Sequence, residues 1–475
     1  MTSRNRTHNN SEKNRLMKKF AVFIALLILF SGLCPLNVSA QGLTFKQALE
    51  KMYADNESLK ASEAAIDMNE YTKKAARGLY FPKIWVNGKQ THIDDDIIID
   101  LNDIRTVIGT IHPAYAATLP SFETKVQNSH YSNANINLSW MLFTGGKITA
   151  VNKAAEAKVA ESKEQMLYVK SVLTTELAKR YYGYILSIKA IQVYKQALAA
   201  IEQHLNQSRK LENNGMLATS ERLHAEVAYA EALRKHNKSI RKTKISLAGL
   251  KNTLSSEEAI EPASSLFITR EIKPLEEYLN NAKQRNHILK KIKTKKNQVA
   301  QNYNAKFSAN MPKVYLFGKY ELYKDDLTLL EPEWAAGVGV NLSVFEGFSD
   351  FNKIRAAKKL QEQVDHTAAK AKSDILTLVE KKYNELMMEI EQYEALETSM
   401  VAAKENSRVQ KQAFKAGMTT SLSVVDAQLT LSKVRIEKLN AVYGFDVALA
   451  ELLEVCGVSE KYESYQNNDD VEVLL

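Results

Sequence analysis

Cysteine and clustered metal-ligating residues are scarce in this sequence. Its 475 residues include two cysteines, Cys34 and Cys456. Cys34 lies in an N-terminal segment that we expect to be removed, so Cys456 would be the only thiol left and no internal disulfide can form. The nine histidines are scattered, and neither a His-Glu-x-x-His nor a Cys-x-x-Cys pattern occurs. We therefore expect no catalytic, metal or cofactor site, and we predict that the protein is not an enzyme.

Long hydrophobic runs are equally scarce. The one candidate, residues 20–30, is too short to cross a bilayer as a helix. Basic residues precede it and the small triplet Val38-Ser39-Ala40 follows it, which predicts a signal peptide over residues 1–40. A lipid anchor on Cys34 is the alternative, although Leu33 stands where the usual bacterial lipidation motif has a small residue. A chain without membrane helices can enter a membrane only as β-strands.

A strong excess of one charge sign is also missing. The formal net charge of +9 falls to +4 when residues 1–40, with six basic residues and one acidic residue, are set aside. The sequence contains no recognised RNA- or DNA-binding motif. Composition and motifs together argue against a nucleic-acid partner.

Proline is absent from residues 121–261 and 333–475. Because proline breaks helix interiors, both stretches are free to hold very long helices. In the first stretch, apolar or small residues recur every three or four positions from Ile148 to Ile188, and the second stretch reads the same way. This spacing marks one buried helical stripe and predicts helices over about 146–213 and 349–416.

A glycine stops each long helix. Gly215 follows the first and Gly417 follows the second, in the position where a left-handed residue commonly ends a helix. Further helices are predicted over about 219–254 and 421–455. Two helices joined by such a short turn pack as an antiparallel hairpin.

The chain also repeats itself. Phe143-Thr144-Gly145-Gly146 corresponds to Phe345-Glu346-Gly347-Phe348 at an offset of 202, which Gly215 and Gly417 share. Phe81-Pro82-Lys83-Ile84 corresponds to Met311-Pro312-Lys313-Val314 at an offset of 230. Two recurring offsets imply a duplicated unit with a 28-residue insertion between Pro82 and Phe143, which we expect to be a loop. Gly145, Gly146 and Gly347 are the expected strand-to-helix turns.

Period-two patterns precede both glycine motifs. Apolar residues alternate with small or polar ones over 132–143 and 334–345, and less cleanly over 83–92 and 313–323. Each segment has about the ten residues that cross a bilayer as a tilted strand. Four strands cannot close a barrel alone, so two or three copies would have to complete it. A small soluble β-sandwich beside a coiled coil is the alternative.

Several of these segments resemble the TolC-like outer membrane efflux proteins. They are the signal peptide, the opening around Ala48 and Leu49, the strand starts at Phe81-Pro82-Lys83-Ile84 and Met311-Pro312-Lys313-Val314, the strand ends at Phe143 and Phe345, and the stretch 416–428. The resemblance covers residues 43 to about 457. It implies a homotrimer, mainly α-helical with a transmembrane β part, in which long helical hairpins form a tunnel and each copy contributes four strands to a 12-stranded barrel.

The predicted organisation follows. It comprises a signal peptide (1–40), a first repeat (41–255), an equatorial linker (256–273), a second repeat (274–456) and a C-terminal tail (457–475). Each repeat runs helix, strand, loop, strand, very long helix, glycine turn and helix. The resemblance implies that the linker and the tail form a belt around the middle of the tunnel, and we keep the name belt for these two segments.

The resemblance also implies partners. They are outer-membrane lipid, a periplasmic adaptor and an inner-membrane pump, for which the chain would be the exit duct in efflux or type I secretion. The adaptor-contact candidates lie at the periplasmic tip and are Gly215, Met216, Gly417, Met418 and Thr419. Alternatively, the two glycines only turn the chain. A soluble periplasmic coiled-coil scaffold or adaptor is the alternative function.

A pore aperture is the last expectation. Relatives often carry Gly-x-x-Thr-x-x-Asp-x-x-Asp after the tip. Here Gly417 and Thr420 match, Ser423 replaces the first aspartate, and Asp426 is the second. In a trimer Asp426 would form a ring of three carboxylates, and such rings bind cations. The alternative is that Ser423-x-x-Asp426 is a capping box at the start of a helix.

Overall fold

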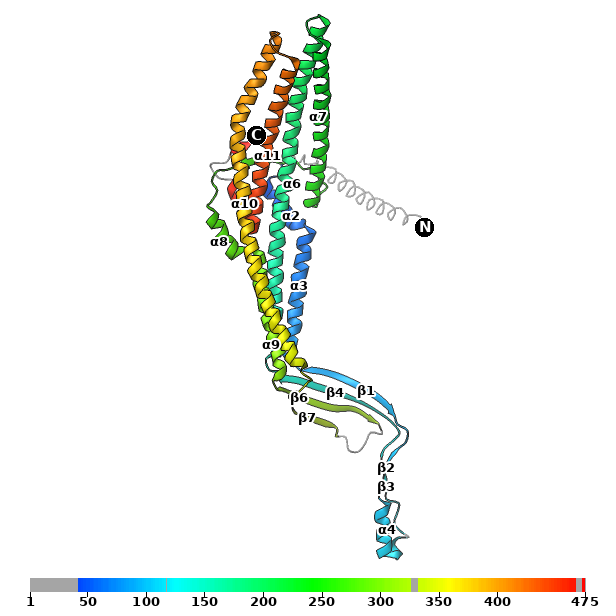
Figure 1. Ribbon diagram of the computed structural model, residues 1–475. Helices are drawn as coiled ribbons and strands as arrows, with labels where there is room; N and C mark the ends of the chain where they lie inside the picture. The colour runs from blue at the N-terminus through cyan, green and yellow to red at the C-terminus, as the bar shows by residue number, and fades with distance from the viewer. Residues whose placement is uncertain (1–41, 117, 326–331, 467–471, 475) are drawn as a thin grey trace, which may run out of the picture.

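The computed structural model describes residues 42–116, 118–325, 332–466 and 472–474. The predicted signal peptide lies outside the described residues. Figure 1 shows an elongated molecule with helical hairpins at one end, a curved sheet toward the other, and a ribbon carrying short helices beyond the sheet. We call the two ends of the helical part the hairpin end and the sheet end.

Four helices make up most of the length. α6 (Lys147–Asn213) and α10 (Ser349–Lys415) have 67 residues each, which corresponds to rods of about 100 Å. α7 (Thr219–Thr253) and α11 (Ser421–Cys456) return beside them as antiparallel partners (Figure 1). The bounds of α6 and α10 differ by one residue at most from those expected from the proline and glycine pattern.

The first helix of each repeat is broken, contrary to the expectation of one helix. The first repeat has α2 (Phe45–Asp55) and α3 (Glu57–Gly78), and the second has α8 (Leu275–Arg285) and α9 (His287–Phe307). Asn56 and Asn286 stand at the breaks. Each has an extended or near-extended backbone, and its side-chain oxygen accepts a hydrogen bond from an N–H in the first turn of the next helix. An asparagine that caps the following helix thus ends the preceding one.

The main sheet has four antiparallel strands in the order β1-β4-β6-β7. They are β1 (Lys83–His92), β4 (His130–Phe143), β6 (Lys313–Asp325) and β7 (Trp334–Asn341). β7 ends four residues before the predicted 345. Asn341 pairs with Lys313, the first residue of β6, and the preceding Pro312 has no N–H with which to extend the ladder.

The expectation of a loop between β1 and β4 is wrong. β2 (Ile97–Asp100) and β3 (Glu123–Gln127) pair as an antiparallel ribbon, and α4 (Asn102–Ile111) and α5 (Pro113–Ala116) lie between them. We call residues 93–129 the insertion. The described residues contain eight strands rather than four, because the insertion adds β2 and β3 and the belt adds β5 (Leu266–Ile268) and β8 (Glu472–Leu474), which pair with each other.

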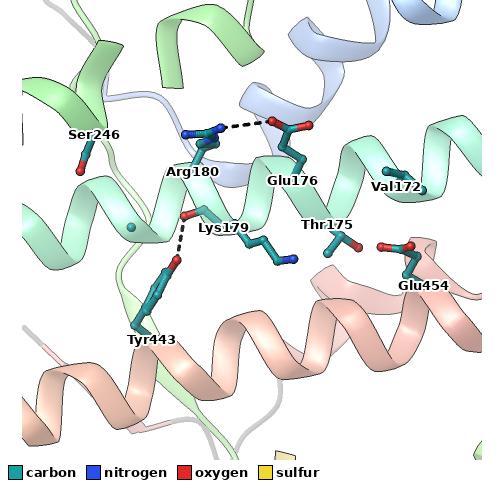
Figure 2. A pocket seen from close by; sticks show the side chains of 9 residues that line it. Val172, Thr175, Glu176, Lys179, Arg180, Ser246, Tyr443 and Glu454 are labelled. Carbon is teal, nitrogen blue, oxygen red and sulfur yellow. Dashed lines mark hydrogen bonds and ion pairs between the residues drawn. The ribbon is translucent and has the colours of Figure 1, made fainter. Parts of the chain in front are cut away.

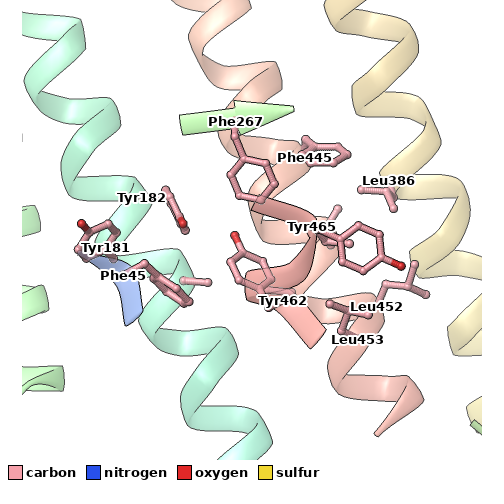
Figure 3. Packing of buried hydrophobic residues seen from close by; sticks show 14 of the residues in the cluster. Phe45, Tyr181, Tyr182, Phe267, Leu386, Phe445, Leu452, Leu453, Tyr462 and Tyr465 are labelled. Carbon is pink, nitrogen blue, oxygen red and sulfur yellow. The ribbon is translucent and has the colours of Figure 1, made fainter. Parts of the chain in front are cut away.

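The main hydrophobic core lies where the belt crosses the long helices. Phe45, Tyr182, Phe267, Phe445 and Tyr462 are almost fully buried and their rings contact one another (Figure 3). These side chains come from α2, α6, β5, α11 and α12 (Tyr462–Gln466), which follows a short 3-10 turn (Ser459–Lys461). Aromatic side chains bury large apolar areas, so the belt holds both repeats together at one level.

The long helices form a wall with two edges. Near the hairpin end the order of packing is α7, α6, α11, α10, and near the sheet end it is α3, α6, α9, α10. The first repeat therefore supplies one edge at every level, through α7, α3 and β1. The second repeat supplies the other edge, through α10 and β7.

Candidate functional site: the two-faced sheet and the hairpin ends

The strand register divides the main sheet into two chemically different faces. From Ile84 to Gly88 of β1, and at the positions paired with them across β4, β6 and β7, apolar or glycine residues meet on one face, which we call the apolar face. Its members are Ile84, Val86, Gly88, Ile136, Leu138, Trp140, Val314, Leu316, Gly318, Tyr320, Trp334, Ala336, Val338 and Val340. Trp334, Val338 and Val340 are each more than 60% exposed in the single chain. Such an exposed patch marks a membrane or protein contact.

The opposite face, which we call the polar face, carries polar, small and aromatic residues. Asn133, Asn135, Asn137 and Ser139 line it along β4. The Nδ2 atom of Asn137 donates to Oδ1 of Asn135 at 2.7 Å, so these amides form a ladder along the strand. A sheet with one apolar and one polar face is the arrangement expected when lipid lies on one side and water on the other.

Two glycines of β7 make room for aromatic rings on the polar face. Tyr315 lies across from Gly339, and Phe317 lies across from Gly337. A Cβ at Gly339 would come within 2.4 Å of the Tyr315 ring, and one at Gly337 within 2.9 Å of the Phe317 ring. The rings therefore cover the glycine backbone, a pairing that helps fix register.

The strand-to-helix turns have left-handed backbones. Gly145, Gly146 and Gly347 have φ values of +61°, +86° and +59°. Phe348 occupies the position that Gly146 holds in the first repeat and has a φ of +62°. The left-handed conformation costs a residue with a Cβ about 1–2 kcal/mol, so the second repeat carries strain that the first avoids.

The two hairpin ends share one backbone motif. Gly215 and Gly417 have φ values of +70° and +74°. After each glycine, the N–H of Met216 or Met418 donates to the carbonyl five residues earlier, at 2.8 and 2.9 Å. This is a Schellman-type helix end. Both methionine side chains are more than 70% exposed, and Thr419 donates to Gln410 at 3.0 Å.

A polar junction that the sequence did not indicate joins the hairpins. His204 in α6 lies 2.7 Å from the Ser421 hydroxyl, and the Ser421 N–H donates to Glu221 of α7 at 2.7 Å. Burial, reinforced by Lys411, lowers the pKa of His204. A neutral imidazole therefore ties the start of α11 to α6.

The structure does not support a capping box at Ser423-x-x-Asp426. The N-cap of α11 is Thr420, whose hydroxyl accepts from the Ser423 N–H at 3.2 Å and lies 3.0 Å from the Ser423 hydroxyl. Asp426 lies in the second turn and is exposed. It lines a cavity of about 710 Å³ that Lys235 and Lys433 also line. Asp426 makes no hydrogen bond or ion pair with another described residue.

A second cavity, of about 550 Å³, lies between α6 and α11 near the belt (Figure 2). Glu176 and Arg180 form an ion pair at 3.6 Å, and the Tyr443 hydroxyl donates to the Lys179 carbonyl at 3.3 Å. Burial raises the pKa of the Glu454 carboxyl.

Asp446 is the most unusual ionisable group of the belt core. Its side chain is fully buried, and neither carboxylate oxygen has a hydrogen-bond partner among the described residues. The Phe267 N–H and the Tyr462 hydroxyl lie close by and lower the pKa of Asp446, but they offset only part of the effect of burial. Burial therefore raises the pKa of Asp446 well above its usual range, which favours the neutral acid.

Within the described ranges, no helix combines the length and apolarity needed to cross a membrane. No group of three or more metal-ligating side chains gathers in that part of the chain.

Comparison with known proteins gives a family and a fold. Residues 48–256 and 278–458 match the family described as outer membrane efflux protein. No curated protein matches the chain.

Solved structures share the fold at low sequence identity. A membrane protein from Pseudomonas aeruginosa is 14% identical, with 87% of this chain and 90% of that chain covered and a TM-score of 0.72. VceC from Vibrio cholerae is 14% identical, with 87% of this chain and 96% of that chain covered and a TM-score of 0.70. The open state of the MtrE channel from Neisseria gonorrhoeae is 16% identical, with 87% of this chain and 89% of that chain covered and a TM-score of 0.70.

Proposed function

The chain belongs to the outer membrane efflux protein family, and from this premise we propose that it is one third of a trimeric outer-membrane channel. Four strands from each of three copies close a 12-stranded barrel, and the long helices continue it as a periplasmic tunnel. The observation that carries the proposal is the apolar face, because a sheet that exposes Trp334, Val338 and Val340 to water would be costly to leave uncovered.

The two edges of the wall explain how copies join. At every level one edge belongs to the first repeat and the other to the second. Joining unlike edges between copies is a heterologous contact, which gives a closed ring when the rotation closes. β7 of one copy then pairs with β1 of the next, and α10 lies beside α7 of the next.

Charge supports this pairing. Residues 233–253 of α7 hold seven basic and no acidic residues, and residues 383–400 of α10 hold five acidic and no basic residues. Both segments lie at similar distances from the hairpin ends. Some of the acids already pair within the chain, as Glu394 does with Arg270 at 2.9 Å, but Glu391 is exposed. Opposite charges across a seam favour one partner edge over another.

The duplication specifies the register of the missing seam. Inside the chain Leu138 of β4 pairs with Gly318 of β6. Shifting these positions by the repeat offsets of 202 and 230 gives Val340 of β7 and Gly88 of β1. Both lie on the apolar face, so the internal seam predicts that Val340 pairs with Gly88 of the next copy.

A cysteine pair tests ring closure. Val340→Cys with Gly88→Cys, expressed in outer membranes and oxidised, should give covalent dimers and trimers on non-reducing gels, because paired strands bring Cα atoms within disulfide range. A Cβ at Gly88 meets no atom within 4 Å. Val340→Cys with Val86→Cys is the matched control, displaced by two residues on the same face. A water-soluble monomer, or equal cross-linking in both pairs, would contradict the proposal.

We further propose that the hairpin end docks onto a periplasmic adaptor and, through it, an inner-membrane pump. The exposed Met216 and Met418 side chains and the turns at Gly215 and Gly417 form the contact surface, and Thr419 lies beside them. Asp426 forms the aperture ring. Its exposure and its lack of a partner among the described residues support this role, because a carboxylate committed to helix capping would be engaged by backbone N–H groups.

A further inference from the structure

Two histidines that are far apart in the sequence meet at the outer end of the sheet. His92 is the last residue of β1 and His130 is the first residue of β4, and they face each other in the register. Their ring centroids are 4.0 Å apart and the ring planes differ by 31°. Both residues are exposed. The pair closes the base of the insertion, which projects beyond this point in Figure 1.

Ser129 orients both rings. Nδ1 of His92 lies 3.3 Å from the Ser129 carbonyl oxygen, which can only accept, so His92 carries its proton on Nδ1 and keeps the Nε2 lone pair. Nδ1 of His130 lies 3.4 Å from the Ser129 hydroxyl. Ser129 is itself held because its N–H donates to Asp96 at 2.5 Å, and Asp96 pairs with Lys125. Such a second layer of contacts is typical of histidines prepared for metal binding.

We propose that His92 and His130 together bind one divalent transition cation, such as Cu²⁺, Ni²⁺ or Zn²⁺, with water completing the coordination. Imidazole nitrogens suit these ions, whereas Mg²⁺ and Ca²⁺ prefer oxygen ligands. A zinc-type ion lies about 2 Å from each ligating nitrogen, so one ion can be shared only by rings that lie side by side, and the centroids of these two rings are 4.0 Å apart. The described residues supply no third protein ligand, so the affinity is modest.

The bound cation acts as a clip at the base of the insertion. The β1–β4 pair and the β2–β3 ribbon are separate sheets, joined by residues 93–96 on one side and 128–129 on the other. A metal link between His92 and His130 fixes the spacing of the two chain segments where they leave the sheet. The insertion should then open less often, because binding to the native state alone stabilises it.

Titration of Cu²⁺ alone into the full chain tests the site. The protein is purified in detergent without a histidine tag and stripped with EDTA, and binding is measured by calorimetry and by paramagnetic resonance. His92→Ala and His130→Ala should each weaken Cu²⁺ binding by at least about tenfold. Removing even an outer-shell partner of a metal site costs about that much affinity. The double variant should bind Cu²⁺ no more weakly than either single variant. His112→Ala, in the same insertion, is the matched control.

Either single variant binding like the unaltered protein would overturn the chelate. An equal loss in His112→Ala would do the same, since it would indicate scattered surface binding. Hydrogen exchange over residues 97–127 tests the clip separately. Zn²⁺ should slow exchange there in the unaltered protein and not in His92→Ala, and cation binding without slower exchange would overturn the clip.

Discussion

Replacing Asp446 by asparagine should stabilise the folded chain at neutral pH. The carboxyl lies in the belt core with both oxygens buried and unpartnered among the described residues, and burial raises its pKa well above the usual range. Asparagine has nearly the same shape and carries no charge at any pH. The substitution therefore removes the ionisation of this site and little else.

The size of the effect follows from proton linkage. A folded-state pKa above the unfolded value means that the acid is best tolerated at low pH and that stability falls as pH rises toward the folded pKa. Aspartate in the unfolded chain has a pKa of about 3.9, so keeping Asp446 protonated at pH 7 costs up to about 4 kcal/mol. A buried amide and a buried neutral carboxyl leave similar hydrogen bonds unmade. The gain should thus be close to zero near pH 4 and grow toward neutral pH, with that value as its upper limit at pH 7.

Thermal unfolding of the detergent-solubilised protein at pH 4.5 and pH 7.5, followed by circular dichroism, measures this difference. Asp446→Asn should raise Tm at pH 7.5 and leave it nearly unchanged at pH 4.5. Asp426→Asn, on an exposed position of the same helix, is the matched control and should show no such pH dependence. A Tm lowered by Asp446→Asn more at pH 7.5 than at pH 4.5 would refute the reasoning, because it would mean that an ionised Asp446 is held by favourable contacts.

Three further predictions concern the hairpin end. Gly417→Arg places a Cβ at a φ of +74° and should cost about 1–2 kcal/mol, leave the trimer intact and reduce adaptor capture in a pull-down; unchanged capture would restrict Gly417 to turning the chain. The lowered pKa of His204 means that its neutral form stabilises the junction above about pH 6.5 and that this stability is lost as pH falls. The protection of amides at the start of α11, measured by hydrogen exchange relative to the intrinsic rate at each pH, should therefore fall toward pH 5, and His204→Gln should remove that dependence. Asp426→Asn should reduce cation selectivity in bilayer conductance without changing Tm; unchanged selectivity would place the aperture elsewhere.

Much of the helical part could be predicted from the stretches that contain no proline. Prolines are missing from residues 121–261 and 333–475, and the four long helices α6, α7, α10 and α11 occupy most of these two stretches. Proline and glycine act locally on the backbone, so their positions constrain helix ends with little help from tertiary structure. Breaks by a capping side chain are harder to see, because Asn56 is compatible with a helix interior as well as with an N-cap.

The insertion was missed for a different reason. The Asp94-Asp95-Asp96 run and two prolines favour a loop, but Ile97, Ile98 and Ile99 pair with a strand more than twenty residues later. β-strands depend on partners that are distant in sequence, so a short strand inside a polar segment gives a weak local signal.

The pairs of the candidate site depend on the same long-range information. Alternation of apolar and polar residues predicts two faces for each strand, yet only the register shows that all four apolar sets lie on one face. The partners of His92 and His204 lie 38 and 217 residues away, at His130 and Ser421. No spacing rule within one segment could join them.

The belt has a consequence for circular permutation of the chain. The N–H of Leu43 donates to the carbonyl of Glu261 at 2.7 Å, and β8 pairs with β5, so both ends of the described chain are attached to the linker at residues 256–273. Neither attachment involves a residue of the insertion. In a circular permutant, a short flexible peptide would join these two ends and new ends would be opened between α4 and β3. Such a permutant should keep every long helix. Its free ends would lie beyond the sheet rather than at the level of the belt.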